Sequence, residues 1–275
     1  RCYAFFHPGM SDEPLIFIEV ALVEGLATSI QELLDEGAPD TDPREADTAI
    51  FYSISNTQKG LQGISFGPFL IKQVVSNLRQ ELPNLRTFST LSPLPGFRHW
   101  LTTYIEAAMT GKEQDPILNA INEAARLLDT DAEPDAFFNL PNWSQNQQVT
   151  EILREPLLSL CARYLHEQRE KDQAPLDPVA RFHLGNGARI ERINWFGDTS
   201  AKGMQESCGL MVNYLYHLKE MEQNIEAYAT NRDIAAAKRV RTLLRDDEDE
   251  KGQLTRLRRM ISLRRSNGSN NPAQT

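Results

Sequence analysis

The segment from Ala49 to Leu78 constrains the fold more than any other part of the sequence. An apolar β-type run, AIFYSI, leads into a polar loop that contains Gly60, Gly63 and Gly67, and a helical apolar stripe begins just after Pro68. β-Branched and aromatic residues favour a strand, and proline suits the first turn of a helix. A strand that passes through a glycine-rich loop into a helix predicts a layered fold, in which helices cover a sheet.

The glycine-rich loop has two interpretations. Backbone N–H groups of such a loop, together with the N-terminus of the following helix, can bind a phosphate or pyrophosphate, and glycine lets the backbone approach it closely. The loop matches neither the Walker pattern nor the Rossmann fingerprint. From the residues alone, an anion site and a plain connecting loop both remain open.

Other strand signals fall into two groups that lie before and after the middle of the chain. The pattern of 29–36 predicts a short amphipathic helix, and Gly185-Asn186-Gly187 predicts a tight turn. Residues 209–216 fit either a strand or the start of a helix. Apolar β-type runs predict further strands at 1–6, 15–23, 87–91, 179–184 and 188–195.

The middle of the chain has a helical pattern. We expect a helical insertion over about 97–170, with an acidic, loop-like stretch at 129–146 and a helical stretch at 149–169 that Pro156 breaks or kinks. The chain from Glu220 onward is helical and densely charged, and it ends in a Ser/Asn-rich stretch typical of disorder.

Composition limits the compartment and the partners. The net charge of −9 argues against binding to nucleic acid or an anionic membrane, and no apolar run approaches the roughly 20 residues of a membrane helix. Cys2, Cys161 and Cys208 have neither disulfide nor zinc spacing, which suits a reducing compartment. We therefore expect a cytoplasmic protein. The C-terminus is not a peroxisomal signal, and a mitochondrial location stays open because a targeting segment would precede Arg1.

Two side chains are candidates for chemistry. Ser92 follows the strand predicted at 87–91, where site residues of layered folds often lie, although a serine there also caps turns and helices. His183 precedes a tight turn and could act as an acid or base near neutral pH, or could simply be a packed, hydrogen-bonded histidine. The sequence has no His-x-x-x-His pair and no Gly-x-Ser-x-Gly elbow, so we expect no metal site.

Five strings give a more specific indication, because together they closely resemble malonyl-CoA decarboxylases. They occur in the family's order and with its spacing, and the resemblance runs from Arg1 to about Leu218. The strings are FYSISNTQKGLQGISFGPFLIK (51–72), FSTLSPLPGF (88–97), DPVARFHLGNGA (177–188), RINWFGDTS (192–200) and ESCGLMVNYLY (206–216).

The resemblance implies an α+β fold of the acetyltransferase-like (GNAT) type. This is a mixed β-sheet flanked by helices, which splays open to hold coenzyme A. It implies a catalytic domain over 1–222, with the helical insertion inside it. The charged helical or disordered extension expected over 223–275 is longer and more charged than the family pattern, and we assign it no role. Members of the family carry a helical domain before the Arg-Cys-Tyr start, which they use in oligomerisation. This sequence lacks that domain. We expect a full-length protein that carries the domain to be a homo-oligomer.

The resemblance also implies an activity, namely decarboxylation of malonyl-CoA to acetyl-CoA and CO2 without a cofactor. This is a carbon–carbon lyase (carboxy-lyase) reaction of fatty acid metabolism. Ser92 and His183 would form the catalytic pair, with His183 protonating an enolate, and Ser53 and Tyr216 would line the acyl pocket. The loop expected to hold coenzyme A consists of Gly60, Gln62, Gly63, Ile64, Ser65, Phe66, Gly67 and Pro68.

Two other functions remain open at this point. An acyltransferase on the same fold would use a coenzyme A thioester with an amine acceptor, and it would not require the pair of Ser92 and His183. A non-catalytic acyl-CoA-binding fragment would bind coenzyme A without releasing CO2. Assays with malonyl-CoA alone, and with acetyl-CoA and amines, separate these functions.

Overall fold

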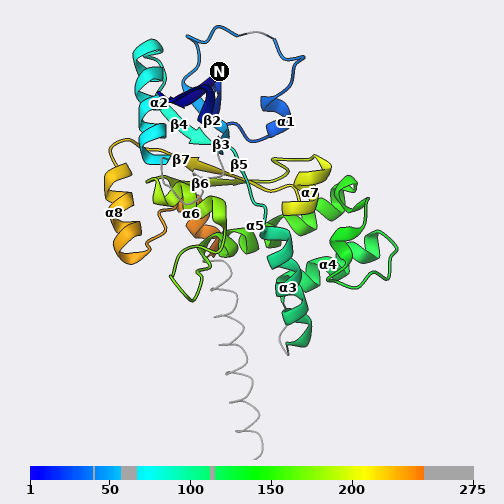
Figure 1. Cartoon of the computed structure of the whole chain (residues 1–275). Helices are drawn as coiled ribbons and strands as arrows, with labels where there is room; N and C mark the ends of the chain where they lie inside the picture. The colour runs from blue at the N-terminus through cyan, green and yellow to red at the C-terminus, as the bar shows by residue number, and fades with distance from the viewer. Residues whose placement is uncertain (40, 57–66, 112–114, 245–275) are drawn as a thin grey trace, which may run out of the picture.

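The computed structural model describes residues 1–39, 41–56, 67–111 and 115–244 (Figure 1). Within these residues the chain forms one mixed sheet of seven strands, with helices on its faces and a helical body to one side. The strand order is β1-β2-β3-β4-β7-β5, and β6 pairs with β7. The strands are β1 (Cys2–His7), β2 (Met10–Val23), β3 (Thr48–Asn56), β4 (Thr87–Thr90), β5 (Ser92–Pro93), β6 (Arg189–Asn194) and β7 (Met211–Leu215).

Two strands separate in the middle of this sheet. β3 and β4 pair in parallel, but only from Thr48 and Thr87 to Phe51 and Thr90. β3 continues beyond Phe51 against β2, whereas the chain after Thr90 turns to pair as β5 with β7. The sheet therefore opens between β3 and β5, at the positions that carry Ser53 and Ser92.

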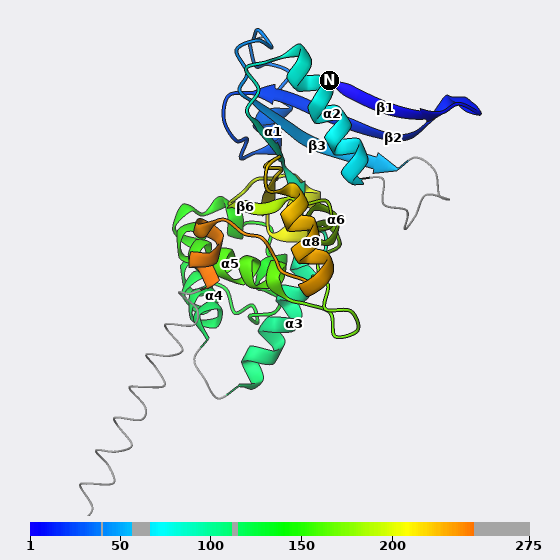
Figure 2. The ribbon, with the colours of Figure 1, turned by 90° about the vertical axis from the view of Figure 1, so that its left-hand side faces the viewer.

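The helices have unequal roles. α2 packs its predicted apolar stripe, including Leu70, Val74 and Leu78, into the core of the sheet. Figure 2 shows α2 alongside β1–β3, with the other long helices gathered in a separate body below them. The helices are α1 (Ile30–Leu33), α2 (Gly67–Glu81), α3 (Phe97–Thr110), α4 (Pro116–Leu127), α5 (Gln147–His166), α6 (Pro178–Gly185), α7 (Ala201–Ser207) and α8 (Met221–Asn231), with short 3-10 turns at Phe137–Asn139 and Trp143–Gln145.

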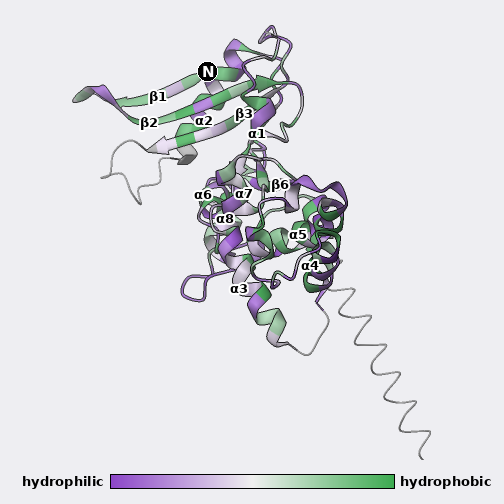
Figure 3. Ribbon diagram, turned by 90° about the vertical axis from the view of Figure 1, so that its right-hand side faces the viewer, coloured by the Kyte–Doolittle hydropathy of each residue, from purple (hydrophilic) through white to green (hydrophobic). Residues whose placement is uncertain are grey.

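The expected helical insertion is confirmed, and it consists of α3, α4, the two 3-10 turns and α5. The proline does not break the helix, one of the two outcomes expected for it, because α5 continues through Pro156 as a single helix. The helix has a side-chain cap at Asn146 and buries Leu153 and Leu157 on either side of the proline. This packing outweighs the hydrogen bond that proline removes from a helix. Figure 3 shows hydrophobic residues along β2 and in the inner parts of α4 and α5.

The strand expected at 179–184 was wrong, because this segment is helix α6. Asp177 accepts a hydrogen bond from the Ala180 N–H, and Pro178 occupies the first turn. A capping aspartate followed by proline is a typical helix start, and this local signal outweighs the apolar run that follows it. Residues 209–216, which were left open, form strand β7, and helix α7 was not predicted.

The C-terminal part is helical as far as the structure describes it. After α8, Ala236 pairs with Ile190 of β6, and residues 238–244 are helical. Ser159 of α5 donates a hydrogen bond to the Leu243 carbonyl, so this segment packs against the insertion. The charged tail expected beyond it lies outside the described residues. No helix in the described ranges has the length and apolar character to cross a membrane.

Gly187 gives a test of the turn that joins α6 to β6. Its φ is +85°, and an added Cβ would lie 2.5 Å from the Met221 carbonyl oxygen of α8. We expect Gly187→Ala to lower the free energy of unfolding by about 2–3 kcal/mol. Gly25 also has a positive φ, of +68°, but nothing lies within 4 Å of its added Cβ. Gly25→Ala is therefore the matched control and should cost only about 1 kcal/mol, for backbone strain alone. Equal losses in denaturant titrations would contradict the close approach to α8.

Candidate active site

Ser92 and His183 are 91 positions apart in the sequence, but they are in contact in the structure. Ser92 begins β5 and pairs with Val212 of β7, and its Oγ lies 3.1 Å from Nε2 of His183. Both side chains are almost fully buried, at 5% and 4% exposure. The structure thus brings the two candidates together in a protected position.

The other side of the His183 ring is held by two tyrosines, Tyr214 of β7 and Tyr216, which directly follows this strand. Its Nδ1 lies 2.7 Å from the hydroxyl of Tyr216, and its ring stacks on that of Tyr214 with the ring centroids 4.5 Å apart. Residues two apart on a strand face the same side, so Tyr214 and Tyr216 approach the imidazole together. Both nitrogens of the ring therefore have defined partners.

Burial controls the charge of this group. Removal from water lowers the pKa of His183 to about 3, because the charged imidazolium loses its solvation. Burial also raises the pKa of Tyr214 and of Tyr216 well above the usual range, so both phenols keep their protons. The ring is therefore a neutral imidazole at neutral pH, with one nitrogen donating a hydrogen bond and the other accepting one.

A row of hydroxyl groups fixes β7 behind the histidine. The backbone N–H of Tyr214 donates to Oγ1 of Thr90 at 3.1 Å, and the Tyr214 carbonyl accepts from Oγ of Ser89 at 3.1 Å. Oγ of Ser92 lies 2.8 Å from the same Thr90 oxygen. Side chains therefore replace the regular ladder bonds where β4 ends and β5 begins.

A buried carboxyl group caps α6, the helix that carries His183. Asp177 is fully buried, and burial raises its pKa. Its two oxygens accept hydrogen bonds from the Ala180 N–H at 2.7 Å and from the Tyr164 hydroxyl at 3.1 Å. The Tyr164 hydroxyl also lies only 2.5 Å from the place of a Cβ on Gly96, at the start of α3. Tyr164 of the insertion therefore touches the chain segments that follow Ser92 and precede His183.

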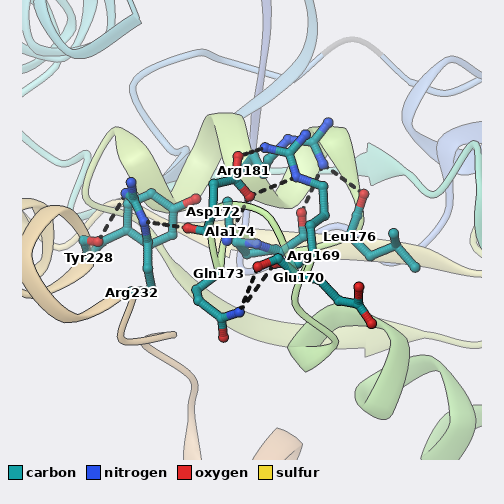
Figure 4. A network of polar contacts seen from close by, with 10 residues as sticks. Arg169, Glu170, Asp172, Gln173, Ala174, Leu176, Arg181, Tyr228 and Arg232 are labelled. Carbon is teal, nitrogen blue, oxygen red and sulfur yellow. Dashed lines mark hydrogen bonds and ion pairs between the residues drawn. The ribbon is translucent and has the colours of Figure 1, made fainter.

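The loop that precedes α6 is fixed by a polar network (Figure 4). Arg181 of α6 donates to the carbonyls of Pro175 and Leu176 at 2.8 and 2.7 Å. Arg232, which follows α8, donates to the Asp172 carbonyl and lies over the Tyr228 ring. These contacts tie the loop to α6 and to α8, so they help to set the position of the helix that carries His183.

The expected binding residues are placed only in part. Tyr216 lies against His183, as described above. Ser53 is half-buried on β3 opposite Glu19, two residues beyond the point where β3 and β4 separate. Of the coenzyme A loop, only Gly67 and Pro68 fall in a described element, the first turn of α2. The remaining residues lie outside the described part of the chain, namely Gly60, Gln62, Gly63, Ile64, Ser65 and Phe66.

Comparison with known proteins settles the family. A family model described as the malonyl-CoA decarboxylase C-terminal domain matches residues 1–254. This chain belongs to that family. Malonyl-CoA decarboxylase, mitochondrial, of Mus musculus is 41% identical over 253 residues, which cover 89% of this chain and 51% of the mouse protein.

Solved malonyl-CoA decarboxylase structures share the fold. The enzyme from Rhodopseudomonas palustris has a TM-score of 0.77 and 48% identity, over 88% of this chain and 52% of that one. The enzyme from Agrobacterium vitis has a TM-score of 0.76 and 47% identity, over 89% and 56% of the two chains. The expected α+β fold, a mixed sheet flanked by helices, is thereby confirmed. The chain spans about half the length of the curated relatives it matches.

Several residues of this candidate site were not foreseen from the sequence. Thr90 and Tyr214 lie two positions from Ser92 and Tyr216, so strand periodicity could have placed each of them beside its neighbour. Asp177 carries a helix-start signal, whereas nothing in the local sequence points to Tyr164, which arrives from the insertion. Among the described residues, no group of three or more His, Cys, Asp or Glu side chains could hold a metal ion.

Protonation of His183 should make the free energy of unfolding depend on pH. The folded pKa of about 3 lies below the ordinary value of 6.5, so the unfolded chain binds the proton more readily. This contribution to stability is fully present above pH 6.5 and is lost as the pH falls from there toward 3. Between pH 6.5 and 5 we expect the parent to lose about 1.5 kcal/mol more of its unfolding free energy than His183→Gln. Denaturant titrations across this range measure the two slopes, and identical slopes would contradict a neutral buried ring.

Gly96 and Tyr164 allow a test of the contact between the two halves of the site. We expect Gly96→Ala to lower the free energy of unfolding by about 1–3 kcal/mol, since the new methyl group meets a buried, hydrogen-bonded hydroxyl. Adding Tyr164→Phe removes that oxygen. The double variant should therefore be more stable than the sum of the two single losses predicts. Strictly additive losses in a double-mutant cycle would show that Gly96 and Tyr164 do not meet.

Proposed function

We propose that this chain carries the catalytic site of a malonyl-CoA decarboxylase, which converts malonyl-CoA to acetyl-CoA and CO2. The observation that carries the proposal is the buried contact between Ser92 and His183, with Tyr216 closing the far side of the ring. Membership of the family supports it. Both side chains lie where the sheet opens, as an acyl group entering between β3 and β5 requires.

The reaction places modest demands on the protein. The bond between the α-carbon and the carboxylate breaks, its electron pair moves into the thioester carbonyl, and CO2 departs from an enolate. The α-carbon then takes one proton, which ultimately comes from water. The thioester itself is the electron sink, so we propose that no cofactor or metal takes part. The protein must orient the carboxylate, stabilise the oxyanion and deliver the proton.

His183 delivers that proton in this mechanism. The ring is neutral in the free protein, but the carboxylate of a bound malonyl group is a negative charge that favours the imidazolium. Loss of CO2 moves this charge from the carboxylate to the enolate, which is then the base that takes the proton. The proton then passes from Nε2, directly or through the hydroxyl of Ser92, to the α-carbon. The next substrate restores the imidazolium with a proton from water.

Substrate binding would use the opening of the sheet. The acyl group would lie near Ser53 and Ser92, where β3 and β5 separate, with Tyr216 beside His183. The coenzyme A phosphates would meet the glycine-rich loop and the N-terminus of α2, a helix of 15 residues, since a helix N-terminus favours an anion. Donors to the thioester oxygen would come from the same loop.

The cellular setting of this activity stays a prediction. The curated mouse and goose relatives are named as mitochondrial enzymes, so a mitochondrial location for this chain stands beside the cytoplasmic one that its sequence suggests. Malonyl-CoA and acetyl-CoA are the proposed partners, and nucleic acid and membranes are not. The proposed full-length protein is a homo-oligomer.

The central test compares the parent chain with Ser92→Ala and His183→Ala, by measuring CO2 and acetyl-CoA formed from malonyl-CoA. We expect each variant to lose activity by about 10²–10⁴-fold, because each lacks a group that positions or transfers the proton. Binding of coenzyme A, measured by calorimetry, should change little. Ser11→Ala and His99→Ala, on exposed side chains, are the matched controls and should keep the parent rate.

Two outcomes would contradict the proposal. A parent chain that binds malonyl-CoA but releases no CO2 would be an acyl-CoA-binding module, or would need further sequence for turnover. A chain that instead moves the acetyl group of acetyl-CoA to an amine would be an acyltransferase.

A further inference from the structure

Thr90 lies next to the proposed catalytic pair, but it does not contact the histidine. It is fully buried at the end of β4, two residues before Ser92. Its Oγ1 is shared by two groups, the Ser92 hydroxyl at 2.8 Å and the Tyr214 N–H at 3.1 Å. Thr90 thus links the serine of the site to the strand that supports the imidazole.

The distances give a direction to the hydrogen bonds that cross the site. The 2.7 Å contact between Tyr216 and Nδ1 suits a phenolic O–H donor, and the 3.1 Å contact between Nε2 and Ser92 suits a longer N–H donor. The 2.8 Å contact suits an O–H of Ser92 that donates to Thr90. In this arrangement the four groups donate in one direction, from Tyr216 through His183 and Ser92 to Thr90.

The opposite direction is less favourable. It would require Nδ1–H to donate to the Tyr216 oxygen, and the phenolic hydrogen of Tyr216 would lose the imidazole acceptor. A phenol is a stronger donor than an aliphatic hydroxyl, and a neutral imidazole nitrogen is a good acceptor for it. The same arrangement would have Ser92 donate to Nε2, so its oxygen would not be placed to accept from the Nε2–H that the imidazolium of the proposed mechanism carries.

The geometry points to Thr90 as a positioning residue: its oxygen takes the hydroxyl hydrogen of Ser92, and thereby keeps His183 in the tautomer with its hydrogen on Nε2. The Ser92 hydroxyl has only one hydrogen. If Thr90 accepts it, Ser92 Oγ is free to accept from Nε2–H; if nothing accepts it, Ser92 competes to donate to Nε2 instead. The inference rests on the proposed function for its catalytic consequence, but not for the tautomer itself.

Thr90→Val tests this role, because valine has nearly the shape of threonine and no hydroxyl. We expect kcat for malonyl-CoA to fall by about ten- to hundredfold, with the KM changed by less than about threefold, since Thr90 acts on the proton and not on coenzyme A. Thr90→Ser restores the hydroxyl and should recover most of the lost kcat. Circular dichroism and thermal unfolding establish that each variant is folded at the assay temperature.

A second measurement reads the histidine directly. The chain has five histidines, so 15N labelling of histidine gives few NMR signals, and the His183 signals are those missing from His183→Gln. In the parent at neutral pH, the shifts should report hydrogen on Nε2 and none on Nδ1. In Thr90→Val the fraction with hydrogen on Nδ1 should rise, and in Thr90→Ser it should return toward the parent.

The outcomes are distinct. An unchanged tautomer and an unchanged kcat in folded Thr90→Val would overturn the inference, as would a loss of kcat that Thr90→Ser does not recover. If Thr90→Val does not fold, Thr90→Cys is used instead, because its sulfur is a weak acceptor for the Tyr214 N–H. The same shift of the His183 tautomer is then expected. A parent that releases no CO2 would refute the proposed function, whereas the tautomer in the same proteins would still decide the role of Thr90.

Discussion

The burial of the His183 ring is the constraint on which the site depends. An imidazole removed from water is neutral, so each nitrogen must find a partner of the right kind, and here Tyr216 and Ser92 supply them. The stacked ring of Tyr214 leaves the imidazole little freedom to rotate. Any change to one of these partners therefore affects the direction of the other hydrogen bonds as well as the position of the ring.

The site is assembled from elements that the sequence keeps far apart. Ser92 lies at the break between β4 and β5, the two tyrosines come from the end of β7 and the residue after it, and α6 brings His183 against them. The insertion connects these parts, because Tyr164 of α5 binds the capping carboxylate of α6 and packs against the segment that follows Ser92. The helical insertion thus supports the geometry of the candidate site and is not only an addition to the sheet.

Sequence patterns predicted most of this architecture and failed where local signals competed. Strand patterns placed β1 to β4 and β6, and the resemblance singled out Ser92, His183 and Tyr216, which the structure brings into contact. The helix α6 was mistaken for a strand because its apolar run outweighed the capping Asp177 in the interpretation. Tyr164 could not be predicted. It lies over 70 residues after Ser92 in the sequence, and its contacts depend on how the insertion folds back onto the site. The partners of a buried side chain are set by tertiary packing, which periodicity does not encode.

A buried neutral histidine also gives the proposed site a way to respond only to its substrate. The cost of charging the ring in the free protein is large, because its pKa is about 3. A thioester with a carboxylate offsets that cost by placing a negative charge nearby, whereas acetyl-CoA has no such charge. In the proposed mechanism the acid forms when malonyl-CoA is bound, and its proton goes to the enolate, which carries the negative charge once CO2 has left. Burial then favours the return to a neutral ring, since the acetyl-CoA that forms places no negative charge near His183.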